Sequence, residues 1–471
     1  MAAITKQEHQ KELFGHPVGL YVLFFTEMWE RFSYYGMRAI LVLYLVQTTS
    51  DANPGLGWTN GEALALYGWY TMLVYVASIP GGWIADKFLG QKKSVLYGGI
   101  LLVAGHSVLA IEEMWAFYTG LGLIIAGVGM LKPNISTMVG GLYKQGDIRR
   151  DKGFTIFYIG INVGAFLSSL IVGTVGEVYG WHYGFGLAGI GMALGLLQYV
   201  LGQKHLAHVG NFLGKSQNAE EKEAMNKPLT KVEKDRVVVL FISFLLVIVF
   251  WGAFEQAGGL MNIYASEKTN RLLSFSLPFI GNEIPASWFQ SLNAMFIIFL
   301  GTTVAGYWAN RKLKGKTATS LFKMIVGLII MGTGFFFMTA AAGQYETNGS
   351  SAMYWLVLAY LFHTVGELCI SPVALSYITK LAPLKYASLM MGVYFAMTGF
   401  GNKLAGLLGE ASESLGEYTI FTGIAVFCIL FGLLVMLFRK KLEMLTHGAE
   451  DNEGEVLEQE PYELADPDIN N

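Results

Sequence analysis

Charged residues are scarce in this sequence. They make up 14% of its 471 residues, whereas an average soluble protein carries about 25%. Apolar residues account for 53%, and the mean hydropathy is +0.45. This depletion is too large for a soluble protein with a well-filled core, so we expect an all-α membrane protein that crosses the bilayer several times. The net charge of −3 gives no indication of nucleic-acid binding.

Cysteine is also rare, and the only two, Cys369 and Cys428, lie in apolar runs. They indicate no disulfide framework. The N-terminal segment MAAITKQEHQKELFGHP is too polar for a signal peptide, so we expect the first apolar run to remain as a span. The enzyme motifs His-Glu-x-x-His and Gly-x-Ser-x-Gly do not occur. We therefore expect no enzyme, no metal site and no bound cofactor.

Twelve apolar runs are long enough to cross a bilayer. They form two sets of six, at 17–47, 61–86, 94–112, 115–142, 153–177 and 183–203, and at 236–264, 285–310, 318–341, 352–380, 386–410 and 416–438. We expect two six-helix bundles, 1–203 and 236–443, joined by a polar cytoplasmic linker at 204–235. The acidic segment 444–471 is expected to be a disordered cytoplasmic tail.

The basic residues between these runs indicate the orientation of the chain. With the N-terminus placed inside, only Lys268 and Arg271 fall in outer loops, and the other loop residues of this type are cytoplasmic. This asymmetry follows the positive-inside rule. Both termini are therefore expected in the cytoplasm, as an even number of spans requires.

The first span contains the stretch EMWERFSYYG, residues 27–36, which places charges where hydrocarbon should lie. Arg38 follows two residues after this stretch. Helical spacing brings Glu27, Arg31, Tyr34, Tyr35 and Arg38 into one sector of the helix, and Glu30 lies at the edge of that sector. Each charge facing lipid would cost roughly 2.5–3.5 kcal/mol. The sector must therefore face protein or water.

Other spans also hold isolated charges, with polar residues near them in the sequence. The charges are Lys132, Glu255, Glu367 and Lys403, and the polar companions are Asn162, Gln256, Asn293, Tyr75 and Tyr158. Structural ion pairs between helices are one interpretation. The other is a cavity for a ligand that carries both signs, because four helices supply both signs to one interior.

In such a cavity, groups of opposite charge would bind opposite ends of the ligand. Arg31 and Lys132 are expected to hold a carboxylate, and Glu367 with Asn162 and Asn293 an ammonium. A buried carboxylate beside an arginine can alternate between a paired and a protonated state, which could connect a proton to a conformational change. Two halves with a site at the midplane predict transport by alternating access.

The first motif resembles the E-x-x-E-R-F-x-Y-Y-G signature of the proton-dependent oligopeptide transporter family, which has the major facilitator fold. It is matched by Glu27, Glu30, Arg31, Phe32, Tyr34, Tyr35 and Gly36. Residues 153–166 resemble the second family signature, F-Y-x-x-I-N-x-G, at Phe157, Tyr158, Ile161, Asn162 and Gly164. The segment 81–94 is similar to the major facilitator loop motif at Asp86 and Gly90. The stretches 250–259, 287–296 and 366–383 resemble the seventh, eighth and tenth helices of the family.

The resemblance implies a symporter that imports di- and tripeptides with protons, without an obligate protein partner, in the bacterial inner membrane. It implies proton coupling by Glu27, Glu30, Arg31 and Lys132, carboxyl-end binding by Arg31, Tyr35 and Lys132, and amino-end binding by Asn162, Asn293 and Glu367. The side-chain pocket would include Tyr34, Tyr75, Tyr158, Trp251, Glu255, Gln256 and Tyr394.

The sequence departs from the family pattern in three places. Gly68 stands where animal members carry a histidine tied to proton coupling, which leaves His106 and His363 as outside candidates; helix packing is the simpler role for both. Alanine follows Asn293 where proline is common. The linker is too short for the two extra helices that many bacterial members insert there.

Four alternatives remain at this level. A related carrier of nitrate or another non-peptide solute would have no use for Glu367 opposite a cationic site. A multidrug antiporter is disfavoured by the paired cations Arg31 and Lys132. A membrane-embedded enzyme would leave the charged cavity unexplained. A receptor with this fold would bind peptide without accumulating it.

Overall fold

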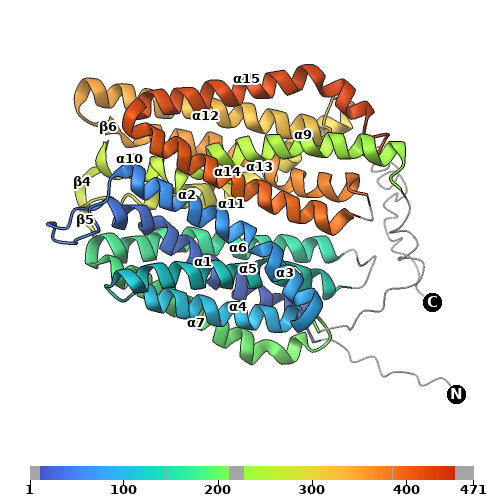
Figure 1. Ribbon diagram of the computed structural model, residues 1–471, viewed down its shortest axis with the longest axis horizontal. Helices are drawn as coiled ribbons and strands as arrows, with labels where there is room; N and C mark the ends of the chain where they lie inside the picture. Colours follow the sequence, from blue (N-terminus) through green and yellow to red (C-terminus); the bar gives the residue numbers. More distant parts are fainter. Residues whose placement is uncertain (1–10, 144–146, 148, 212–227, 384–385, 451–471) are drawn as a thin grey trace, which may run out of the picture.

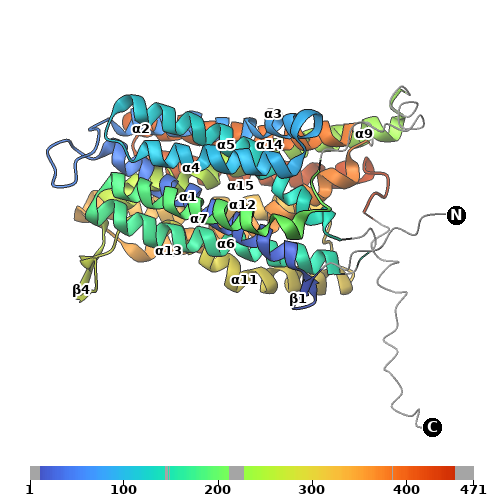
Figure 2. The same cartoon turned by 90° about the horizontal axis from the view of Figure 1, so that it is seen from below.

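The computed structural model describes residues 11–143, 147, 149–211, 228–383 and 386–450. Within these ranges, long helices lie side by side in one elongated bundle (Figures 1 and 2). The first six helical segments are α1 (Val18–Val46), α2 (Asn60–Val76) continued by α3 (Ser78–Ile84) and η1 (Ala85–Leu89), α4 (Gln91–Leu109), α5 (Met114–Gly141), α6 (Arg149–Thr174) with η2 (Val175–Tyr179), and α7 (Trp181–Gly202) with η3 (Gln203–Leu206).

Six further segments follow the linker. They are α9 (Lys231–Phe254) with η4 (Glu255–Ala257) and α10 (Leu260–Glu267), α11 (Trp288–Leu313), α12 (Ser320–Asn348), α13 (Met353–Leu381), α14 (Ala387–Leu415) and α15 (Glu417–Met444). In the described part of the chain, nine segments are long and apolar enough to span a membrane by composition alone. The segments of α1, α4 and α14 are not among them, and α1 carries four charged side chains. The predicted all-α membrane fold is confirmed.

Helix starts differ from the apolar runs because capping residues begin the helices in polar sequence. Thr230 accepts a hydrogen bond from the Glu233 backbone N–H, and the Glu233 carboxylate accepts one from the Thr230 N–H at 2.8 Å. This capping box starts α9 at Lys231, five residues before the predicted span. Thr59 and Glu62 form the same box at α2. Much of the predicted linker, residues 212–227, lies outside the described residues.

Short strands mark the two ends of the bundle. The antiparallel pair β4 (Leu272–Leu277) and β5 (Gly281–Glu283) projects at one end, called here the hairpin end, together with β3 (Thr269–Asn270) and β6 (Ser351–Ala352). The pair β1 (Glu12–Leu13) and β2 (His16–Pro17) lies at the other, the β1 end (Figure 2). The apolar pattern predicted none of these strands. All but β4 have two or three residues, and most of the six residues of β4 are exposed.

The first residues of the predicted tail pack on the β1 end of the bundle. Arg236 donates from Nε to the Thr446 carbonyl at 2.9 Å, and the His447 ring lies 2.7 Å from the Asp235 carboxylate. The Glu450 carboxylate accepts from the backbone N–H of Ser320, the first residue of α12. The expectation of a disordered tail therefore does not hold for residues 445–450. The remaining tail, 451–471, lies outside the described residues.

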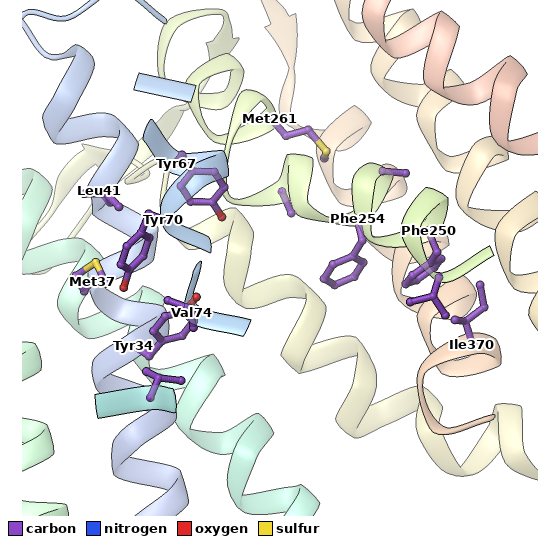
Figure 3. Packing of buried hydrophobic residues seen from close by; sticks show 14 of the residues in the cluster. Tyr34, Met37, Leu41, Tyr67, Tyr70, Val74, Phe250, Phe254, Met261 and Ile370 are labelled. Atoms are coloured by element: carbon purple, nitrogen blue, oxygen red, sulfur yellow. The ribbon is translucent and has the colours of Figure 1, made fainter. Parts of the chain in front are cut away.

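The core is apolar and runs through both halves. Tyr34 and Met37 of α1 lie against Tyr70 and Val74 of α2, and each of the four side chains is at most 3% exposed (Figure 3). Across the halves, α2 packs along α14, and α6 packs against α11. The remaining polar groups on α1 and α2 are therefore held at fixed positions between the two halves.

Two glycines allow the closest approach of α2 and α14. A Cβ atom built on Gly68 would lie 2.8 Å from the Gly406 Cα, which is closer than real Cβ contacts. This contact explains why the histidine of animal family members could not occupy position 68 with the helices packed in this way. Gly68 therefore serves helix packing between the halves.

We expect Gly68→Ala to destabilise the protein, because its methyl group must push α2 away from the α14 backbone. Overpacking of this kind costs about 1–3 kcal/mol. Thermal unfolding of the detergent-solubilised protein should show a lower Tm. Gly82→Ala is the matched control, since a Cβ there meets nothing within 4 Å. Equal Tm values for the two variants would contradict the packing role.

Candidate functional site

The charges of α1 form a compact buried cluster. Arg31 donates from Nε to Glu27 Oε1 at 2.8 Å, and the same nitrogen lies 2.7 Å from Glu30 Oε2. The three residues are at most 3% exposed. Two carboxylates therefore share one guanidinium. Helical spacing placed Glu27 and Arg31 in one sector, with Glu30 at its edge. The Arg31 guanidinium also lies 5.8 Å from the centre of the Tyr35 ring.

Lys132 of α5 lies beside this cluster. Its Nζ is 3.8 Å from the centre of the Tyr75 ring on α2, in a cation–π contact. The Lys132 ammonium interacts electrostatically with Arg31, Glu30 and Glu27. Pro133 follows it directly inside α5, where proline removes one backbone hydrogen bond of the helix. The structure thus brings together all four residues assigned to proton coupling.

The second half presents a separate polar group. Asn293 of α11 donates from Nδ2 to Glu367 Oε2 of α13 at 2.7 Å and to Thr364 Oγ1 at 3.1 Å. Glu367 is 9% exposed. The amide fixes this carboxylate in place and leaves Glu367 Oε1 available for another donor. A cation would be favoured here by charge.

Asn162 is bound differently from Asn293. Its Nδ2 donates to the Tyr158 carbonyl of its own helix, α6, at 2.9 Å. Its side chain also interacts with the Tyr158 hydroxyl. The Tyr158 hydroxyl interacts electrostatically with Glu367 of the other half and with Tyr35 of α1. Asn162 and Tyr158 thus lie on the wall between the two polar groups, although no hydrogen bond joins Asn162 to Asn293 or Glu367 in the described chain.

A third charged group joins the halves. Arg38 of α1 donates from Nη1 to Glu255 Oε1 of η4 at 2.8 Å, and the Tyr67 hydroxyl donates to the same oxygen. The Arg38 guanidinium lies 4.7 Å from the centre of the Tyr35 ring. Tyr35 is therefore placed between the two arginines of α1. Sequence reasoning put Arg38 in the polar sector but gave it no role, and nothing in the sequence marks Tyr67.

The expected pocket aromatics surround these groups. Tyr75 interacts electrostatically with Arg31, Glu255 and Glu367, which places it between the halves. Tyr394 of α14 lies near Tyr75 and Glu367. Trp251 packs edge-on against Phe254, with ring centroids 5.1 Å apart. Tyr34 is 3% exposed and meets Tyr35 edge-on at 5.4 Å.

Gln256 has a bridging position. Its Nε2 donates to the Gly252 carbonyl at 3.2 Å and to the Ala405 carbonyl of α14 at 3.1 Å. The side chain is buried and ties η4 to α14. Its amide nitrogen is therefore already engaged with two backbone carbonyls. The assignment of Gln256 to the side-chain pocket stays a prediction.

The two histidines considered as outside candidates are buried among apolar groups. His363 lies 4.4 Å from the Phe335 ring centre, and neither of its ring nitrogens has a hydrogen-bond partner in the described chain. His106 is likewise buried without such a partner. Both side chains therefore have the packing role that the sequence favoured.

This arrangement defines a class of protein. A bundle of two membrane-embedded halves, with buried charges of both signs on the facing helices, is the architecture of a secondary membrane transporter with its site at the junction.

The comparisons with known proteins give the family. The model of the POT family, PTR2, matches residues 92–219 and 211–416. The chain belongs to this family, whose members are transporters and not enzymes. It is 36% identical over 494 residues to the uncharacterized transporter YclF of Bacillus subtilis, covering 95% of this chain and 98% of YclF. It is 35% identical to a protein of Lactococcus lactis subsp. cremoris named di-/tripeptide transporter, covering 92% and 97%.

Solved structures agree with the fold. A crystal structure of a peptide transporter POT in complex with sulfate has a TM-score of 0.85 and 35% identity, over 93% of this chain and 97% of that one. A POT family transporter in complex with a thioalcohol-conjugated peptide has a TM-score of 0.84 and 31% identity, over 92% and 98%. The chain therefore has the major facilitator fold and is a multi-pass membrane protein.

Proposed function

We propose that this chain imports di- and tripeptides by symport with protons. The observation that carries this proposal is that the two halves place cations on one side and a carboxylate on the other side of the junction between them. Arg31 and Lys132 are cationic and lie on α1 and α5, whereas Glu367, fixed by Asn293, lies on α13. A peptide is a zwitterion, so its two ends match the two sides. Two of the similar proteins support this substrate class, because one is named a di-/tripeptide transporter and the other was solved in complex with a conjugated peptide.

The carboxyl end of the peptide is assigned to Arg31, Lys132 and Tyr35. A guanidinium and an ammonium can both donate to one carboxylate, and such charge-assisted hydrogen bonds are the stronger kind. The Arg31 guanidinium lies over the Tyr35 ring, and the Tyr35 hydroxyl is assigned to the same end of the peptide. The amino end is assigned to Glu367, Asn293 and Asn162. The peptide would thus bridge the halves.

The side chains of the peptide are assigned to the aromatic walls. Tyr34, Tyr75, Tyr158, Trp251, Glu255, Gln256 and Tyr394 are the residues in this group. Aromatic walls fit many side chains through apolar contact and ring edges. The specificity of the carrier would then come from the two charged ends rather than from the walls, which suits a transporter of varied short peptides.

The proton is assigned to the α1 cluster. Glu27 and Glu30 share Arg31, so protonation of either carboxylate removes one of the two negative charges that pair with the guanidinium. Arg31 is then freer to bind the peptide carboxylate. Binding of the proton and of the peptide would favour each other, which is the linkage that symport requires.

The hairpin end is assigned to the outer face and the β1 end to the cytoplasm of a bacterial inner membrane. The distribution of Lys and Arg supports this orientation, since Lys268 and Arg271 lie at the hairpin end. Both termini would then be cytoplasmic. Transport of nitrate or another anion is the alternative. It is disfavoured because an anion would meet the Glu367 carboxylate.

The test is uptake of labelled dialanine into proteoliposomes, with and without an inward proton gradient. We expect accumulation only with the gradient, and counterflow exchange of peptide without it. Exchange without accumulation would reject proton coupling and keep the peptide site. Binding without flux would favour a receptor, and neither binding nor flux, together with nitrate uptake, would favour the anion carrier.

A further inference from the structure

A carboxylate of the first half caps a helix of the second half at the hairpin end. Glu177 of η2 accepts from the Ala286 N–H through Oε2 and from the Ser287 N–H through Oε1, each at 2.8 Å. Ser287 is the N-cap residue of α11, and both donors belong to fully buried residues. The first N–H groups of a helix have no partner within the helix. Here the other half of the protein supplies it.

Neighbouring residues fit the two halves together at this point. Trp288 of α11 donates from Nε1 to Thr174 Oγ1 of α6 at 2.8 Å, which is a third hydrogen bond between the halves at this contact. A Cβ on Gly173 would lie 2.1 Å from Ser287 Oγ, so only glycine allows this approach. The contact is therefore a close fit of two surfaces, with the Glu177 carboxylate at its centre.

The segment that carries Glu177 is held within its own half. η2 is a π-helical turn at the end of α6, and such turns often occur at functional positions. Asn53 donates from Nδ2 to the Gly176 carbonyl at 2.8 Å and to the Glu177 carbonyl at 3.2 Å. The carboxylate is thus presented by a fixed backbone. The bonds from Glu177 to Ala286 and Ser287 cross between the halves, and so does a bond from the Tyr179 hydroxyl of the same turn to the Phe279 carbonyl at 3.2 Å.

We propose that Glu177 is the latch that holds the hairpin end closed. An alternating-access carrier must separate its halves at each end in turn. Opening of the hairpin end breaks both bonds from the carboxylate to α11 and exposes the helix N-terminus. The latch therefore stabilises the closed state relative to the open one. It acts together with other bonds between the halves at this end, such as the bond from the Gly61 N–H to the Glu413 carboxylate at 2.6 Å. This inference rests on the alternating access of the proposed function, and not on the identity of the substrate.

Substrate-free distance measurements between spin labels test the latch. Cysteines are introduced at exposed Trp115 of α5 and Thr347 of α12, both near the hairpin end, in a background without Cys369 and Cys428. In Glu177→Gln, an NH2 group replaces one of the two carboxylate oxygens. This NH2 group faces a backbone N–H and cannot accept its hydrogen bond. We expect the population with the longer distance to rise at least twofold over the wild type.

Two further variants make the result decisive. Ser287→Pro removes one donor from the other side, and the φ of −59° at Ser287 already suits proline. It should shift the distances in the same direction, and it decides the question if Glu177→Gln fails to fold. Glu62→Gln is the matched control, because Glu62 lies at the same end but caps its own helix. Unchanged distances in a folded latch variant, or an equal shift in Glu62→Gln, would overturn the proposal. Because no peptide or proton gradient is present, this outcome is independent of the uptake test.

Discussion

Arg31→Ala is expected to abolish both proton-driven accumulation and counterflow exchange of peptide. The substitution removes the guanidinium that is assigned to the peptide carboxylate, and it leaves Glu27 and Glu30 without the cation that pairs them. Loss of two charge-assisted hydrogen bonds amounts to about 3 kcal/mol or more, which is a reduction of roughly a hundredfold in binding. Both modes of transport are measured in proteoliposomes with labelled dialanine.

Arg31→Lys separates the charge from its geometry. Lysine keeps one positive charge but cannot donate to two carboxylates in a fixed fork. We expect weak exchange in this variant, with a KM raised more than the maximal rate is lowered. The removal of a buried cation also destabilises the fold, so the Tm is measured alongside. Exchange at the wild-type rate in folded Arg31→Ala would refute the carboxyl-end assignment.

Glu30→Gln is expected to abolish accumulation while counterflow exchange survives. Glutamine keeps the size of the side chain but cannot bind and release the proton, and counterflow does not require net proton movement. Glu30 is fully buried and lies 2.7 Å from Arg31 Nε. Glu27→Gln should have the same effect, and we expect accumulation to fall at least tenfold in each variant.

The control for these two variants is Glu410→Gln, on the exposed surface of α14. It changes charge by the same amount without touching the α1 cluster, so accumulation should be unaltered. If either cluster variant accumulated peptide as the wild type does, the proton-coupling role of that carboxylate would be wrong.

The sequence was sufficient to predict the fold and the clustering of charge. Lipid cannot accept four ionisable groups on one helix, so EMWERFSYYG had to face the protein interior. This reasoning brought Glu27, Glu30 and Arg31 together, and the structure shows them sharing one guanidinium. Lys132 lies on another span, and it was assigned to the same interior because a charge within a span avoids lipid.

Contacts between the halves could not be predicted in the same way. The bond from Tyr67 to Glu255 depends on the register of two helices from different halves, and one tyrosine among many carries no signal. The bonds from Ala286 and Ser287 to Glu177 use backbone donors, which every residue except proline has. The packing of Gly68 on Gly406 is likewise visible only when both helices are placed.

The position of the contact between Gly68 and Gly406 also affects how far each end of the molecule moves when the halves tilt. Gly68 lies roughly 12 Å along the helix from Asn60 and roughly 30 Å from Leu89, at 1.5 Å per residue. If the two halves rotate about this contact, the distance from Gly68 to the β1 end is about two and a half times the distance to the hairpin end. A tilt of about 10° would then move the hairpin end by about 2 Å and the β1 end by about 5 Å. A small release at one face thus becomes a wide opening at the other.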